Sequence, residues 1–199
     1  MKRVIDHIKT KAQRLTRRYF TTIFRNDISK QYFKTIAIME SSVTIRKASR
    51  ADSGKILELI EQKAEFDRSM KGFDGKISTS IAKIERTLFG DSPFAHVLLI
   101  EHEREVVGFA LYHYRYSSFS GQPSIWLDDL LIVGRHRSNG YGHALMQALK
   151  REAQASLASH IAWTASPHNS KAHEFYTRLG AEIERMDGQR PYFRWPLCG

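Results

Sequence analysis

Residues 128–142 read DDLLIVGRHRSNGYG, and this stretch decides how the rest of the chain is interpreted. The apolar run Leu130–Val133 is typical of a buried strand, and it leads into Arg137-Ser-Asn-Gly-Tyr-Gly142, where an amphipathic helix is expected to begin. Glycines let the backbone approach a ligand closely, while the N–H groups and dipole of a helix N-terminus attract negative charge. The segment therefore predicts a turn that binds an anion such as a pyrophosphate.

Two familiar nucleotide-binding motifs do not fit this turn. The dinucleotide motif G-x-G-x-x-G is absent because the glycine spacing is reversed, and no Walker A lysine follows. Arg135, His136 and Arg137 add positive charge beside the turn. Since strand–turn–helix connections with two glycines are common, the remainder of the chain has to decide between a binding site and a plain connection.

The segments around this turn alternate between strand-like and helix-like patterns. Strands are expected at 43–48, 95–101, 106–116, 124–133, 161–164, 181–186 and 192–195. Helices are expected after an N-cap at Asp52, at 78–89, at 140–156 and at 170–179, where Gly180 ends the last one, and 71–75 reads as a mobile loop. This order predicts an α/β (α+β) domain in which helices cover a mixed sheet.

The formal net charge of +10 is concentrated near the N-terminus. Residues 1–40 hold ten basic and three acidic residues, a net +7, whereas 41–199 hold 21 and 18, a net +3. We therefore divide the chain into a basic amphipathic extension, 1–40, and a domain, 41–199. The extension is open to several readings: a solvated or partner-packed segment, a contact to an anionic surface or nucleic acid, a transit peptide, or a segment that is not made because translation starts at Met39.

Composition excludes several other classes. The single cysteine, Cys198, cannot form an internal disulfide or a cysteine-based zinc site, and the histidines show no metal-ligand spacing, so no metal is expected. No run of 18 apolar residues is present, so we expect no transmembrane helix and a cytoplasmic location.

Two motifs in the right order resemble one known family. R-x-x-G-x-G between a strand and a helix resembles the acetyl-CoA pyrophosphate motif of the GCN5-related N-acetyltransferase (GNAT) superfamily, and NSKAHEFY at 169–176 followed by LGA at 179–181 resembles its downstream motif. SPFAH at 92–96, GFALY at 108–112 and LDD at 127–129 are most similar to the diamine, spermidine/spermine N1-acetyltransferase type. The resemblance covers about residues 43–196 and implies the GNAT fold, an α/β (α+β) fold whose mixed, mostly antiparallel central sheet is flanked by helices.

The resemblance also implies roles for individual residues. Tyr176 takes the place of the catalytic acid, and Asp128 that of a glutamate which holds and deprotonates the amine. Neighbouring strand residues point to opposite faces, so only one of Asp128 and Asp129 is expected to face the cleft, with Asp129 in a structural hydrogen bond or ion pair. Phe66 and Asp67 match an aromatic–acidic pair of the amine pocket, to which Asp128, Ala162, Trp163 and Thr164 are added.

The implied cofactor-binding set combines the strand, the turn and the second motif. It comprises Leu130, Leu131, Ile132, Arg137, Ser138, Asn139, Gly140, Tyr141, Gly142, His143, Asn169, Ser170, Lys171 and Ala172. The function implied is transfer of an acetyl group from acetyl-CoA directly to a primary amine of a small molecule, by a homodimer that binds no nucleic acid through this domain.

Two departures from the diamine pattern bear on the substrate. The acidic residue common at Ser117 and the tryptophan near 189–191 are missing, which leaves room for a diamine, thialysine or another lysine-like amine in place of a long polyamine. The alternatives are a GNAT enzyme acting on a protein N-terminus, an amino acid or an aminoglycoside, and a membrane- or nucleic-acid-binding module that works through the basic arm.

Overall fold

The computed structural model describes residues 43–197, and the predicted basic extension 1–40 lies outside them. The elements follow in the order β1 (Val43–Lys47), α3 (Ser53–Ser69), α4 (Ile81–Leu88), β2 (His96–His102), β3 (Glu105–Ser117), β4 (Gln122–Ile132), α5 (Tyr141–Ala155), β5 (His160–Thr164), α6 (Ser170–Arg178), β6 (Glu182–Asp187) and β7 (Arg190–Pro196). Short 3₁₀ turns, η1 (Arg50–Asp52) and η2 (Gly134–His136), precede α3 and α5. Every predicted strand and helix of residues 43–197 is present, with ends shifted by up to three residues.

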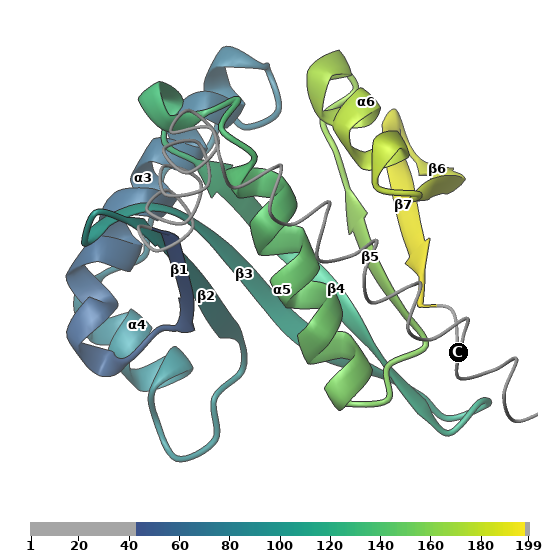
Figure 1. The fold of residues 1–199 in the computed structure, drawn as a ribbon, viewed down its shortest axis with the longest axis horizontal. Helices are drawn as coiled ribbons and strands as arrows, with labels where there is room; N and C mark the ends of the chain where they lie inside the picture. Colours follow the sequence, from purple (N-terminus) through teal and green to yellow (C-terminus); the bar gives the residue numbers. More distant parts are fainter. Residues whose placement is uncertain (1–42, 198–199) are drawn as a thin grey trace, which may run out of the picture. The chain divides into compact units, whose positions relative to one another are not determined.

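The strands form one mixed sheet in the order β1-β2-β3-β4-β5-β7-β6 (Figure 1). The pairs β2–β3, β3–β4, β5–β7 and β6–β7 are antiparallel, and β4–β5 is parallel. A parallel pair needs a crossover, and α5 provides it. The predicted mixed, mostly antiparallel sheet flanked by helices is confirmed.

Helices cover both faces of the sheet. Ile56 and Leu59 of α3 and Ile84 of α4 pack with Val97, Leu99, Phe109 and Leu131 of β2, β3 and β4 in one buried cluster. On the other face α5 contributes Leu145, Met146 and Leu149, which are completely buried (Figure 1). Ile56 and Leu59 are three residues apart, and Leu145 and Leu149 are four apart, so the apolar stripe of each helix packs against the sheet.

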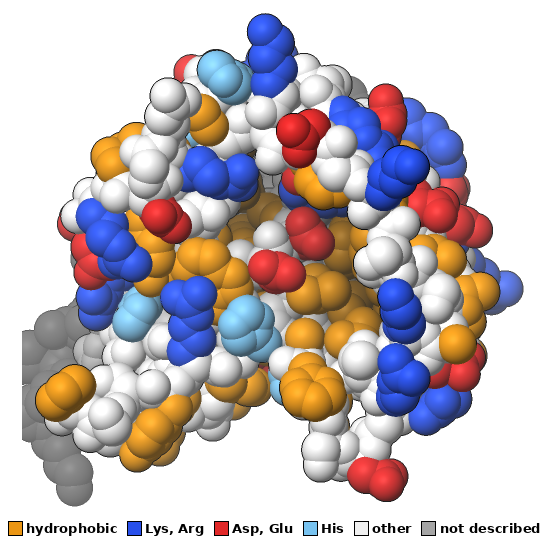
Figure 2. Space-filling model, turned by 180° about the vertical axis from the view of Figure 1, so that it is seen from behind, with side chains coloured by type: hydrophobic (Ala, Val, Ile, Leu, Met, Phe, Trp, Pro, Cys, Tyr) orange, Lys and Arg blue, Asp and Glu red, His pale blue; other side chains and the backbone are white. Residues whose placement is uncertain are grey.

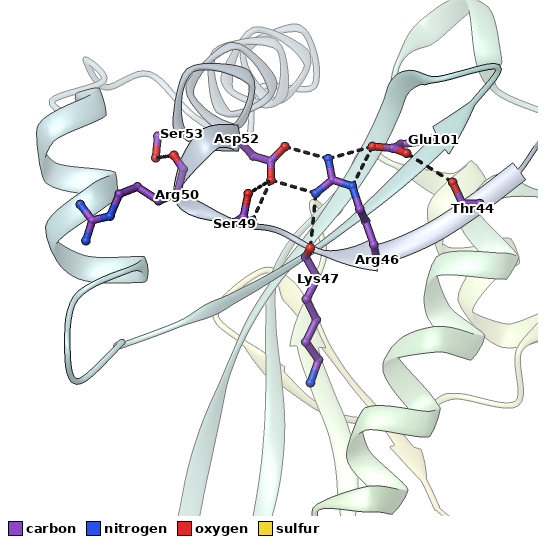
Figure 3. A network of polar contacts seen from close by, with 8 residues as sticks. All are labelled: Thr44, Arg46, Lys47, Ser49, Arg50, Asp52, Ser53 and Glu101. Carbon is purple, nitrogen blue, oxygen red and sulfur yellow. Dashed lines mark hydrogen bonds and ion pairs between the residues drawn. The ribbon is translucent and has the colours of Figure 1, made fainter.

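Asp52 occupies the N-cap position of α3, as the sequence predicts, but its side chain accepts no hydrogen bond from the helix. Its carboxylate instead accepts hydrogen bonds from the backbone N–H of Ser49 (2.7 Å) and from two guanidinium nitrogens of Arg46 (2.8 Å each). The remaining Nε–H of Arg46 donates to Glu101 of β2 (2.8 Å), so one guanidinium joins β1, β2 and the start of α3 (Figure 3). A bidentate pair between two ions gives two charge-assisted hydrogen bonds in place of a single one to a backbone N–H, which explains why Asp52 turns toward Arg46.

Gly180 has φ +88°, in the left-handed region, and directly follows Leu179, the C-cap residue of α6. Its backbone N–H bonds back to Thr177, which closes the helix as its sequence position predicts. Among the described residues, no helix is long and apolar enough to cross a membrane.

Candidate active site

The parallel pairing of β4 with β5 ends after only two residue pairs, Ile125–Ile161 and Trp126–Ala162. Beyond Trp126, β4 continues to Ile132 and pairs only with β3 among residues 43–197. One backbone edge of residues 127–132 is therefore left without a strand partner. Figure 1 shows β4 and β5 diverging beyond this point.

This unpaired edge borders a pocket of about 200 Å³ whose walls come from α3, β4, β5, α6 and β7. Figure 2 shows the hollow, with acidic side chains near its centre. Nine of the residues that the sequence assigned to a site line it: Phe66, Asp67, Asp128, Leu130, Trp163, Thr164, Asn169, Ala172 and Tyr176. The structure thus gathers residues that lie up to 110 positions apart in the chain.

Asp128 and Asp129 both line this pocket, whereas strict alternation along a strand predicts that only one of them faces it. The reason is a register shift between β3 and β4. Leu111 pairs with Asp129 and Tyr112 pairs with Leu127, which leaves Asp128 without a partner on β3. An extra residue of this kind is a β-bulge, and it interrupts the alternation of side chains along a strand.

Lys63 of α3 connects two of the pocket's carboxylates. Its ammonium is ion-paired with Asp67, one helical turn further along α3, and lies 3.4 Å from a carboxylate oxygen of Asp129. The ion pair expected for Asp129 is therefore present. Burial raises the pKa of Asp129 above its usual value, and the nearby ammonium of Lys63 opposes part of that rise.

Tyr176 of α6 is held by aromatic neighbours on three sides. Its ring centroid lies 4.8 Å from that of Trp163, 5.2 Å from Phe193 and 5.3 Å from Phe175. Its hydroxyl group forms no hydrogen bond within residues 43–197, although the residue lines the pocket. Burial, reinforced by the negative charges of Asp67 and Asp129, raises the pKa of Tyr176, so the phenol stays protonated near neutral pH.

Trp163, on the neighbouring strand β5, is only 2% exposed. Its indole Nε1 is buried without a hydrogen-bond partner among the described residues. It therefore serves Tyr176 chiefly as an aromatic wall.

The turn before α5 has the features of an anion-binding cradle. Ser138 and Gly140 adopt positive φ angles of 66° and 80°, and Gly140 stands at the N-cap of α5. The six consecutive backbone N–H groups of residues 138–143 have no acceptor within residues 43–197. Helix N-termini normally leave four such groups unsatisfied, so this turn presents an extended row of donors.

The basic side chains near the turn mostly contact other groups of the protein. The Nε–H of Arg137 donates to the carbonyl of Ile132 (3.0 Å), and its guanidinium lies over the ring of Phe66, 4.4 Å from the centroid. Arg135 is paired with Glu105, which also lies 3.7 Å from His136. Positive potential at the turn therefore comes largely from backbone N–H groups and from Arg137.

Some predicted site residues lie away from the pocket. Leu131 and Ala162 are 4% and 2% exposed, which places their side chains in the core, and Ser170 and Lys171 begin α6 without lining the pocket. The side-chain oxygen of Asn169 accepts a hydrogen bond from the N–H of Ala172 (3.2 Å) and so caps α6. Gly142 lies against Phe175 where α5 packs on α6, and a Cβ there would be 3.5 Å from the ring, an ordinary van der Waals distance.

Several pocket residues were missed by sequence reasoning: Lys63, Trp126, Ser166 and Arg190, together with Asp129 as a pocket residue. One signal was available, because Lys63 precedes Asp67 by four residues and so shares its helical face. Arg190 carried no such signal, since only the pairing of β7 with β5 brings it to the pocket. Among residues 43–197, no cluster of three or more potential metal ligands occurs.

Comparison with known proteins agrees with this geometry. The sequence profile described as "Acetyltransferase (GNAT) family" matches residues 60–181, more than half of the chain. The chain belongs to this family. It is an N-acetyltransferase with the GNAT fold.

Three related proteins illustrate the likeness. The thialysine N-epsilon-acetyltransferase of Bos taurus is 29% identical over 148 residues, which cover 70% of this chain and 84% of that protein. The yncA protein of Salmonella typhimurium, solved with its cofactor acetyl-CoA, superposes with a TM-score of 0.58 at 18% identity, over 79% and 95% of the two chains. An aminoglycoside acetyltransferase from a soil metagenome, solved with sisomicin, gives 0.63 at 16% identity, over 75% and 96%. The two solved structures support the fold of this acetyltransferase.

Proposed function

We propose that this acetyltransferase transfers the acetyl group of acetyl-CoA to a primary amine of a small molecule. The observation that carries the proposal is the position of β4 between two sites of opposite charge. Its C-terminal end leads to the free N–H groups of residues 138–143, and its bulge presents Asp128 and Asp129 to the pocket. One end suits a pyrophosphate and the other suits an ammonium group.

The residues that would hold acetyl-CoA follow from this geometry. The N–H groups of residues 138–143 would bind the pyrophosphate, and the unpaired edge of β4 at Leu130 would hydrogen-bond the extended amide chain of the cofactor. When bound, acetyl-CoA supplies a thioester, from which an acetyl group passes to nitrogen as the C–N bond forms and the C–S bond breaks.

The pocket already contains a primary alkylammonium group. The Nζ of Lys63 lies between Asp67 and Asp129, with a side chain that is 18% exposed. An acceptor amine has the same chemistry and would find the same kind of partner at Asp128, which forms no ion pair within residues 43–197. The thialysine acetyltransferase of Bos taurus, named for an amine acceptor, supports the same substrate class.

Two proton transfers accompany the reaction. The amine must lose a proton before its lone pair can attack, and the departing sulfur must gain one. Asp129 is the better-suited base, because burial raises its pKa toward neutrality, whereas the sequence had assigned this role to Asp128. Tyr176, protonated and without another hydrogen-bond partner among the described residues, is the donor available to the sulfur.

The size of the pocket favours small acceptors. Its volume of about 200 Å³ lies below the roughly 300–1,000 Å³ typical of sites for drug-sized ligands. A diamine or a basic amino acid suits this space better than an aminoglycoside.

The proposal is tested by turnover. Purified protein is incubated with acetyl-CoA and a panel of diamines, basic amino acids, aminoglycosides and N-terminal peptides, and release of free thiol is measured. Acetylation of diamines or basic amino acids is the expected result, and turnover confined to aminoglycosides or peptides would refute the small-amine assignment. The predicted homodimer stays a prediction, which light scattering of the purified chain would test.

A further inference from the structure

The pocket is lined by more acidic than basic side chains. Three carboxylates, Asp67, Asp128 and Asp129, face two cations, Lys63 and Arg190. Lys63 is committed to Asp67 and Asp129. The charges left without a partner inside the pocket are therefore one carboxylate, Asp128, and one guanidinium, Arg190.

Arg190 stands apart from the other arginines of its hairpin. Arg185 and Arg194 both form ion pairs with Glu184, at 2.7 and 2.8 Å. Within residues 43–197, Arg190 forms no ion pair, and its one hydrogen bond is a long contact of 3.5 Å to the carbonyl of Gly72. Most of the N–H donors of this half-buried guanidinium are therefore available to a ligand.

The position of Arg190 places it across the pocket from β4. It begins β7, two residues before Tyr192, which pairs with Thr164 at the end of β5. Gly72, the partner of Arg190, follows α3, and its backbone N–H donates a hydrogen bond to the carbonyl of Asp67 (2.8 Å). Arg190 therefore lies where the segment that follows α3 meets β7, at the wall of the pocket contributed by β7.

We infer that the acceptor carries a carboxylate as well as its amine, as a basic α-amino acid does, and that Arg190 binds this carboxylate. This inference rests on the proposed function and specifies its substrate class. The planar guanidinium matches a carboxylate through two parallel hydrogen bonds, which a diamine or polyamine cannot provide.

Net charge supports the same choice. Three carboxylates and two cations leave the pocket with a net charge of −1 when all five groups are ionised. A basic amino acid, with two ammonium groups and one carboxylate, carries +1 and complements that charge. A polyamine brings only positive charge, so it would face Arg190 and compete with Lys63 for Asp67 and Asp129.

The test compares acceptors that differ only in the carboxylate. L-ornithine is compared with putrescine, and L-lysine with cadaverine, by kcat/KM at saturating acetyl-CoA. The wild-type enzyme is expected to prefer the amino acid by about tenfold or more, the usual effect of a charge-assisted hydrogen bond. In R190Q the preference should fall to nearly one, mainly through a higher KM for the amino acid.

A second variant tests the part played by Lys63. In K63M the two carboxylates lose their internal cation, and kcat/KM for diamines should rise relative to that for amino acids. R194Q and K55M are matched controls, since they remove an arginine of the same strand and a lysine of the same helix, both outside the pocket. Both controls should keep the wild-type preference.

The outcomes separate the inference from the proposed function. Wild-type turnover of diamines equal to or better than that of amino acids would overturn the role of Arg190 while leaving amine acetylation intact. A wild-type preference that survives in R190Q would do the same. Failure to acetylate any amine, by protein that binds acetyl-CoA, would overturn the proposed function and this inference with it.

Discussion

Replacement of Tyr176 by phenylalanine isolates the proposed proton donor from its surroundings. The change removes a single hydroxyl group, which forms no hydrogen bond within residues 43–197. The ring contacts with Trp163, Phe193 and Phe175, at 4.8, 5.2 and 5.3 Å between centroids, are all preserved. Folding stability should therefore change by less than about 1 kcal/mol, because no internal hydrogen bond is lost.

The catalytic effect should be far larger than the effect on stability. A positioned general acid typically contributes about 10²- to 10⁴-fold to the rate, so kcat of Y176F should fall by at least about 100-fold. Each tenfold loss corresponds to about 1.4 kcal/mol of transition-state stabilisation. The affinity for acetyl-CoA should stay within about threefold of wild type, because the cofactor's pyrophosphate is assigned to residues 138–143 and not to Tyr176.

The assay combines steady-state kinetics with thermal unfolding, and Tyr112 provides a matched control. Tyr112 is 1% exposed, donates a hydrogen bond to Glu152 of α5 (3.5 Å) and does not line the pocket. Y112F should lower the Tm and leave kcat nearly unchanged, the reverse of the pattern for Y176F. If Y176F kept wild-type kcat, or lost activity only in proportion to lost stability, the acid role of Tyr176 would be refuted.

Three further predictions concern the turn, the base and the Arg46 network. G140V should weaken acetyl-CoA binding at least tenfold and destabilise the fold by about 1–2 kcal/mol, since a β-branched residue is strained at φ +80°. An unchanged acetyl-CoA affinity, measured by calorimetry, would contradict the assignment of this turn to the pyrophosphate. D129N should abolish the acid limb of the pH profile of kcat/KM, because burial raises the pKa of this carboxyl. D128N is the control and should keep that limb. The reverse outcome would assign the base to Asp128. R46M should destabilise the protein by about 1–2 kcal/mol in urea unfolding at pH 7. Hydrogen bonds from Arg46 hold the pKa of Asp52 below its usual range. The stability that this pair contributes is therefore fully present above the unfolded-state pKa, near 4, and is lost as the pH falls below it. The difference in unfolding free energy between R46M and wild type should shrink at pH 2.5.

Local sequence patterns were sufficient for most of the fold. The strands and helices of residues 43–197 follow from apolar periodicity and from residues with a defined local role, such as Gly180 at the end of α6. Asp52 shows where local reasoning stops. An aspartate before a helix has the properties of an N-cap, but the neighbouring Arg46 on β1 offers a stronger, charged partner. Whether Asp52 bonds to the helix or to Arg46 depends on how β1 packs, and the local sequence does not predict that packing.

The candidate site could be predicted only in part. The turn at 137–142 and Tyr176 lie in compact motifs, so their resemblance to a family was visible in the sequence. The bulge at Asp128 is a property of two paired strands, so the alternation pattern of one strand alone does not predict it. Arg190 reaches the pocket through strand pairing, and its partner Gly72 is 118 residues away in the chain.

The bulge and the early end of the β4–β5 pairing act together. Both occur within the four residues from Trp126 to Asp129. The bulge presents two carboxylates to the pocket, while the missing pairing leaves backbone donors and acceptors free along the following residues. From Asp129 to Ile132 an extended strand rises about 10 Å, so one rigid element fixes the spacing between the acidic pocket and the anion-binding turn.

This arrangement separates local charge from the net charge of the chain. The chain carries +10, yet the acceptor pocket carries three carboxylates against two cations. Positive potential is needed only at the turn, where backbone N–H groups supply much of it without any basic side chain. Removing basic residues from the 1–40 segment should therefore leave acetyl-CoA affinity unchanged, because the groups assigned to the pyrophosphate all lie within residues 137–143.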